Sequence, residues 1–129
     1  MKRVSFDFDG TLTEQRVLQF AKKLRDEGYE LWITTLRHSD ENMAALGIKT
    51  FYNNEKLFKI AKQLGIKTNH IQFCNETGYK LEYLIDKDFR FHLDDDRYII
   101  HSIGQHLPHI IVDCYDPDWR TQCLERLVD

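Results

Sequence analysis

Short runs of apolar residues alternate with amphipathic stretches along the whole chain. Leu31, Trp32 and Ile33 form a continuous apolar run, which is typical of a strand that is buried on both faces. Other runs are rich in β-branched and aromatic residues and are bounded by glycine, asparagine or aspartate, as strands are. The pattern predicts strands at residues 2–8, 30–34, 49–52, 70–74, 89–93 and 109–115.

Apolar residues at helical spacing occupy the segments between these strands. Val17, Phe20, Ala21 and Leu24 form one such face, and Gly28 can end that helix. Residues with short polar side chains precede the periodic segments and are expected N-caps: Thr13, Ser39, Asn54 and Asp116. The pattern predicts helices within residues 13–28, 39–47, 54–65, 81–85, 98–103 and 116–127.

Strands and helices that alternate in this way favour a mainly parallel sheet with helices on both faces. We therefore expect one α/β domain over residues 1–129, with a three-layer, Rossmann-like fold. Right-handed crossovers bring the carboxyl ends of the strands to one edge of the sheet, which is where such folds bind ligands. The polar residues that follow the strands are therefore the candidates for a functional site.

Composition narrows the class of protein. The 129 residues carry a net charge of −3, which gives no electrostatic sign of a nucleic-acid binder. No apolar run is long enough to span a membrane, and 3 cysteines, an odd number, favour reduced thiols. We therefore expect a cytoplasmic protein without a membrane partner. The spacing of His101, His106, His109 and Cys114 matches no standard set of zinc ligands.

Two groups of acidic residues follow predicted strands. Asp7 and Asp9 come after the first strand with one residue between them, so their side chains begin on the same side. A second group, residues 94–96, follows the strand at 89–93. Carboxylates brought together repel one another unless a cation or a shared proton offsets their charge. Carboxylates without sulfur ligands or paired imidazoles favour a hard ion such as Mg²⁺.

Hydroxyl and basic side chains are expected at the same edge of the sheet. Thr34 and Thr35 end the second strand, Arg37 follows them, and Lys80 opens the helix before the strand at 89–93. A hydroxyl group, an ammonium group and free backbone amides suit the charged oxygens of a phosphoryl group. The residues by themselves therefore indicate a site for phosphate and a divalent cation.

These motifs resemble, in order and spacing, those of the haloacid dehalogenase superfamily of phosphotransferases. Its first motif, an apolar strand followed by Asp-x-Asp-x-Thr, is matched at residues 7–11. Its second, a strand that ends in Thr or Ser and is often followed by x-Arg, is matched best at residues 35–37. Lys80 matches the lysine at the start of a helix, and residues 93–95 match the apolar strand that ends in paired acids.

The resemblance implies a Mg²⁺-dependent phosphatase that works through an aspartyl-phosphate intermediate. Asp7 would be the nucleophile, and Asp9 would be the general acid and then the general base. Mg²⁺ would be held by the Asp7 carboxylate, the backbone carbonyl of Asp9, and Asp94 or Asp95, with the choice between these two left open. Dehalogenase members lack an acid at the position of Asp9, so its presence favours phosphoryl transfer.

Other side chains would bind the transferring group. Thr35 and Lys80 would hold its oxygens by a hydrogen bond and by charge, and would therefore also take part in catalysis. The residues expected to bind the substrate are Thr11, Thr35, Arg37 and Lys80. Thr34 is an alternative to Thr35, and Lys87 is an alternative to Lys80. Because Asp96 follows Asp95, the paired acids are either residues 94 and 95 or residues 95 and 96.

The chain has no room for the cap domains that many members of the superfamily insert. In this superfamily, open sites resemble those that act on macromolecules or those that a second subunit covers, as in a homo-oligomer. The phosphorylated substrate is therefore either a small molecule or a macromolecule. Residues 95–97 weakly match polynucleotide 3′-phosphatase domains, which makes nucleic acid a possible substrate only. Two rival interpretations are a catalytically idle Mg²⁺-binding protein and a phosphoacceptor receiver domain.

Overall fold

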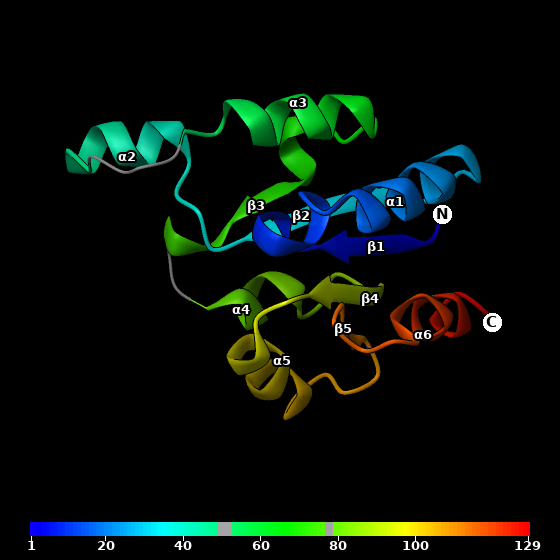
Figure 1. The fold of residues 1–129 in the computed structure, drawn as a ribbon. Coiled ribbons are helices and arrows are strands. Elements are labelled where there is room, and N and C mark those ends of the chain that lie inside the picture. The colour runs from blue at the N-terminus through cyan, green and yellow to red at the C-terminus, as the bar shows by residue number, and fades with distance from the viewer. Residues whose placement is uncertain (49–52, 77–78) are drawn as a thin grey trace.

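The central element is a five-stranded sheet with the order β3-β2-β1-β4-β5. The computed structural model describes residues 1–48, 53–76 and 79–129 (Figure 1). Every pairing within this sheet is parallel, which confirms the predicted α/β, Rossmann-like class. The strands are β1 (Arg3–Phe6), β2 (Glu30–Thr35), β3 (Ile71–Phe73), β4 (Phe89–Asp94) and β5 (Ile111–Asp113). The strand predicted at 49–52 lies outside the described residues.

Helices cover both faces of the sheet, as expected for parallel strands. They are α1 (Gln15–Asp26), α2 (Asp40–Leu46), α3 (Glu55–Gln63), α4 (Lys80–Leu84), α5 (Arg97–Gly104) and α6 (Trp119–Arg126). In Figure 1, α1 and α3 lie on one side of the sheet and α4 and α5 on the other. Within the described residues no separate domain is inserted between the strands.

The larger core lies between the sheet and the helices α1, α3 and α6. Val4 and Phe6 of β1 face this core, and Phe6 packs edge-on against Phe91 with 5.5 Å between the ring centroids. Trp119 of α6 packs edge-on against Phe20 of α1 at 5.2 Å, which joins these two helices. A smaller core on the opposite face includes Trp32, Leu84, Phe89, Ile103 and Ile110.

The main difference from the prediction is at the end of the first strand. β1 ends at Phe6 because residues Phe8–Leu12 form a helical turn that is kinked at Asp9 and Gly10. Gly10 has a φ of 75°, a left-handed conformation that glycine adopts without strain. Thr13 does not cap α1: its hydroxyl accepts a hydrogen bond from the Gly10 amide, and the N-cap is Glu14.

The last helix also begins later than predicted. Asp116 and Pro117 form part of a turn in which the Trp119 amide donates to the Asp116 carbonyl, and α6 begins only at Trp119.

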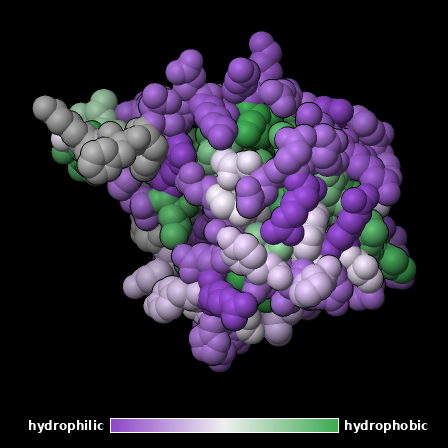
Figure 2. All heavy atoms as spheres, in the orientation of Figure 1, coloured by the Kyte–Doolittle hydropathy of each residue, from purple (hydrophilic) through white to green (hydrophobic). Residues whose placement is uncertain are grey.

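The face of the molecule in Figure 2 is mostly hydrophilic, with smaller hydrophobic areas between the charged side chains. Among the helices of the described segments, none combines the length and the apolar character needed to cross a bilayer.

Candidate functional site

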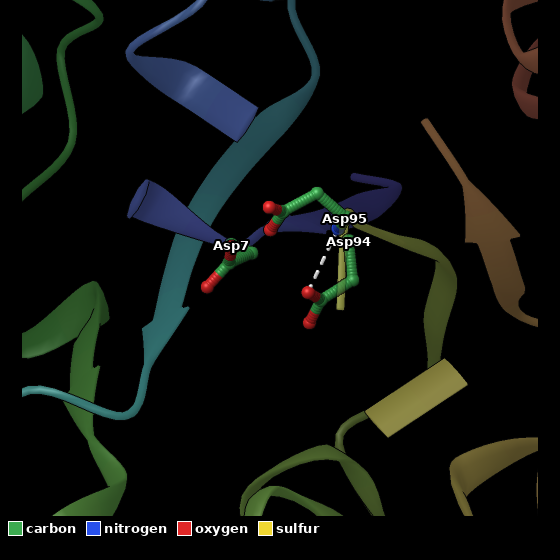
Figure 3. A group of neighbouring side chains, drawn as sticks. All are labelled: Asp7, Asp94 and Asp95. Atoms are coloured by element: carbon green, nitrogen blue, oxygen red, sulfur yellow. Dashed lines mark hydrogen bonds between the residues drawn. The ribbon is translucent and has the colours of Figure 1, made fainter. Parts of the chain in front are cut away.

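Three carboxylates meet where β1 and β4 end. The two strands are parallel neighbours with Phe6 opposite Leu93, so the next residues, Asp7 and Asp94, lie side by side where the strands end. The Asp7 amide also donates to the Leu93 carbonyl at 2.9 Å, which holds the two strand ends together. Carboxylate oxygens of Asp7, Asp94 and Asp95 all lie within 4.8 Å of one another (Figure 3). Among the described residues, this is the one group of three or more His, Cys, Asp or Glu side chains close enough to share a metal ion.

The donor set of this cluster fits a hard divalent cation. It offers only carboxylate oxygens, which are the ligands that Mg²⁺ and Ca²⁺ prefer. Gly10 provides the room for it, because a Cβ at that position would collide with the carboxylate of Asp95. The glycine of the first motif therefore serves the site twice, through its left-handed backbone and through the absence of a side chain.

Lys80 is the basic residue of the cluster. Its ammonium group donates to Asp7 at 2.8 Å and to Asp94 at 2.6 Å, and its side chain is 1% exposed. Burial opposes the charged form of Lys80, but the two carboxylates outweigh burial and raise its pKa. Burial also raises the pKa of Asp7, although the charge of Lys80 opposes this shift. Lys87 lies just before β4 at the other edge of the sheet, where its carbonyl accepts from Arg3, so the structure places Lys80 in the site.

The hydrogen bonds of Asp94 distinguish it from Asp95. One oxygen of Asp94 accepts from the amides of Asp95 and Asp96 at 2.9 and 3.1 Å, and the other accepts from Lys80 and from His92 at 2.8 Å. Burial opposes the ionisation of Asp94, but His92 and Lys80 outweigh it and lower the pKa of this carboxyl. Since a carboxylate has about four acceptor positions, these four donors occupy Asp94 fully.

Asp95 is the better placed of the two acids to bind a cation directly. Its side chain accepts one long hydrogen bond of 3.4 Å, from the hydroxyl of Thr11. The same hydroxyl lies 3.2 Å from Asp7, so this buried threonine shares its one proton between the two carboxylates. Asp96 is occupied elsewhere, because its carboxylate caps α5 by accepting from the amides of Tyr98 and Ile99. The geometry therefore favours Asp7 and Asp95 as the side-chain ligands.

The carboxylate of Asp9 is not part of the three-carboxylate cluster. Its carboxylate is 59% exposed and accepts two hydrogen bonds from the guanidinium of Arg37, at 2.7 and 2.8 Å. Arg37 also donates to the carbonyl of Asn53 and to the side chain of Asn54, which in turn bonds to the chain after β2. Arg37 therefore reaches the site through Asp9, and its contact with substrate stays a prediction, as does the metal contact of the Asp9 carbonyl.

A cavity of about 290 Å³ opens beside the cluster, and its lining includes Asp7, Asp9, Thr35 and Lys80. Thr35 is buried, and its hydroxyl accepts from the Arg37 amide at 3.2 Å. Thr34, the alternative to Thr35, points to the opposite side of β2 and is not part of this lining. The structure thus brings together seven of the eight predicted site residues at one edge of the sheet: Asp7, Asp9, Thr11, Thr35, Lys80, Asp94 and Asp95. Arg37, the eighth, contacts Asp9.

A row of buried polar side chains behind the site was missed in the sequence. Gln72, Thr34, Ser5 and His92 lie on four adjacent strands and are joined by hydrogen bonds of 2.8 to 2.9 Å. The row ends where His92 bonds to Asp94. Its signal in the sequence is a polar residue inside an apolar strand, as in Ser5 between Val4 and Phe6. Burial lowers the pKa of His92, so its neutral imidazole donates to Asp94 and accepts from Ser5.

Replacing His92 with glutamine is expected to change how stability depends on pH. Unfolded chains take up this proton near pH 6.5 and the native protein only at lower pH, so below 6.5 the unfolded chain binds more protons. The contribution of His92 to the free energy of unfolding is therefore complete above pH 6.5 and falls by up to about 1.4 kcal/mol per pH unit below it. Urea unfolding at several pH values measures the difference between wild type and His92→Gln, which shrinks as the pH falls. His101→Gln, at an exposed position, controls for the change of residue type. A difference for His92→Gln that stays constant with pH contradicts the buried, neutral imidazole.

Comparison with known proteins gave no further information. No family model matches the chain, and neither the curated proteins nor the solved structures contain a match.

Proposed function

We propose that this protein is a Mg²⁺-dependent phosphatase that cleaves phosphate monoesters through an aspartyl-phosphate on Asp7. One observation carries the proposal: a carboxylate at a cavity is grouped with two further acids and a buried lysine. Apolar packing alone does not require such a group in a sheet, and burying charged side chains is costly even when they are paired. It suits the transfer of a charged phosphoryl group, to which the resemblance of the motifs also points.

The charge of the cluster explains why a cation belongs to the proposal. Asp7, Asp94 and Asp95 carry three carboxylates, and Lys80 offsets only part of their charge. A carboxylate that approaches a phosphate dianion meets strong repulsion, which a bound Mg²⁺ offsets as a Lewis acid when it is present. Asp7 and Asp95 would hold the ion, with the Asp9 carbonyl as the third protein ligand that the resemblance implies.

The proposed reaction has two steps. In the first, an oxygen of Asp7 forms a bond to phosphorus, the bond from phosphorus to the ester oxygen breaks, and Asp9 gives that oxygen a proton. In the second, Asp9 takes a proton from a water molecule, whose oxygen attacks phosphorus and releases phosphate and free Asp7. Thr35 and Lys80 line the cavity and would bind the phosphoryl oxygens. The ion pair between Asp9 and Arg37 has to open for the proton transfer.

The metal requirement gives a direct test. Wild-type protein is assayed for phosphate release from 4-nitrophenyl phosphate and a 3′-phosphorylated oligonucleotide over a range of Mg²⁺ concentrations. We expect activity that disappears with a chelator. In Asp95→Asn we expect an at least about tenfold higher Mg²⁺ concentration for half-maximal rate, since loss of even an outer-shell partner of a metal ligand weakens metal binding by about 10–100-fold. Asp96→Asn is the matched control: it changes the adjacent acid, whose role as helix cap asparagine also fills.

Three results of this assay contradict parts of the proposal. Equal turnover with Mg²⁺ and with chelator excludes a requirement for the metal in catalysis. Equal Mg²⁺ requirements of Asp95→Asn and Asp96→Asn exclude Asp95 as a metal ligand. The absence of turnover with every phosphate ester favours the catalytically idle Mg²⁺-binding protein.

A further inference from the structure

A second cavity, a groove of about 620 Å³, lies against α4 and α5. It is next to the acid site, the cluster of Asp7, Asp94 and Asp95. Its volume falls within the range of about 300–1,000 Å³ that is typical of small-molecule sites. Leu36, Lys80, Asp96 and Ile99 line both this groove and the smaller cavity beside Asp7. A molecule whose phosphate lies at Asp7 would therefore extend naturally into the groove.

The side chains of the groove suit a flat apolar group. Leu81 and Ile103 contribute apolar surface from α4 and α5, in addition to the shared Leu36 and Ile99. Tyr79 and Tyr98 also line it, and each of these tyrosines is 77% exposed. Tyrosine offers a large, stiff ring on which another aromatic ring stacks at little cost in conformational entropy.

The charges around the groove disfavour a polyanion. Glu82 and Asp96 carry carboxylates there, and Lys80, the one lysine or arginine of its described lining, already bonds to Asp7 and Asp94. A nucleic-acid strand or another chain of phosphates would need several cations along its path. A compact substrate with one phosphate at Asp7 and an uncharged ring in the groove meets no such difficulty.

We propose that this groove binds the leaving group of the substrate, and that the substrate is a small phosphate monoester whose leaving group carries an aromatic ring. This inference rests on the proposed phosphatase function, because it takes Asp7 as the place of the phosphate. The groove determines specificity, because it binds the ring of the leaving group. The bond to phosphorus is broken at the acid site.

Two pairs of compounds measure how much the aromatic ring contributes to binding and turnover. Hydrolysis of 2-phenylethyl phosphate is compared with that of ethyl phosphate, because their leaving alcohols are of similar basicity and differ in the ring. The dissociation constants of the two corresponding phosphonates, which are not hydrolysed, are measured by calorimetry with Mg²⁺. We expect the phenylethyl compound to show an at least tenfold higher kcat/KM, mainly through KM, and its phosphonate to bind at least tenfold more tightly.

Variants assign this preference to the groove. Tyr98→Ala removes a ring from the lining, and Ser102→Trp fills part of the cavity. Both are expected to reduce the preference for the phenylethyl compound to less than threefold while ethyl phosphate is hydrolysed at the wild-type rate. Tyr115→Ala is the matched control, because Tyr115 is also an exposed tyrosine, 57% accessible, and lies outside the groove.

The binding measurement separates the two proposals. Equal affinity of wild type for both phosphonates, or a preference that both groove variants retain, overturns the assignment of the groove. If the phenylethyl phosphonate binds more tightly and the groove variants abolish this preference, but no phosphate ester is hydrolysed, the groove assignment stands and the proposed catalysis fails.

Discussion

Asp7→Asn is expected to lower kcat by at least about a thousandfold, because loss of a nucleophile costs several orders of magnitude in enzymes that use covalent catalysis. An amide does not attack phosphorus. It has nearly the size of the carboxylate, and its one oxygen can still accept from either Lys80 or Thr11. Asp94 still pairs with Lys80 in the variant, and burial already opposes the ionisation of Asp7. Urea unfolding of Asp7→Asn measures how much stability the change costs, and activity is compared under conditions in which both proteins are folded.

Acid quenching during turnover provides the second measurement for Asp7. Wild type incubated with a phosphate ester labelled with ³²P and Mg²⁺ should retain label on the protein, and Asp7→Asn should not. Asp86→Asn serves as the control, because Asp86 is exposed and has a φ of 63°, which asparagine tolerates well. Comparable turnover of Asp7→Asn and wild type, or label retained by the variant, would exclude Asp7 as the nucleophile.

Lys80→Met should have the largest effect on stability, a loss of about 3–5 kcal/mol in the free energy of unfolding, the usual cost of breaking a buried ion pair. The substitution leaves Asp7 and Asp94 buried beside one another without the ammonium group that bonds to both. Activity should fall as well, since Lys80 lines the cavity. Urea unfolding without divalent cations measures the loss, and added Mg²⁺ should restore part of it if a cation occupies the same cluster.

Lys87→Met is the matched control for this prediction. It makes the same chemical change seven positions along the chain, at a lysine whose surroundings are partly exposed and whose described contact is made by its backbone carbonyl. Its effect should stay within about 0.5 kcal/mol, as for most surface substitutions. Equal losses in Lys80→Met and Lys87→Met would contradict the view that Lys80 neutralises the acid cluster.

Much of the fold and of the site follows from local patterns in the sequence. Alternating apolar runs and amphipathic stretches are sufficient to predict a parallel sheet, because each strand is buried on both faces and each helix on one. In such a sheet the carboxyl ends of the strands share an edge, so Asp7, Lys80 and the acids at 94–96 could be expected to meet. The boundaries were less accurate: the helical turn at Phe8–Leu12, kinked at Asp9 and Gly10, makes the first strand shorter than predicted.

The tertiary structure decided which partner each of these polar groups has. Thr34 and Thr35 are adjacent and chemically identical, and only the position of β2 beside β1 turns one toward Ser5 and the other toward the cavity. Asp94 and Asp95 likewise differ in their hydrogen bonds, because Lys80 of α4 and His92 of β4 donate to Asp94. Local sequence determines which residues face the same side of a strand or helix. The hydrogen bonds between side chains from separate strands depend on register and distance, which exist only once the chain has folded.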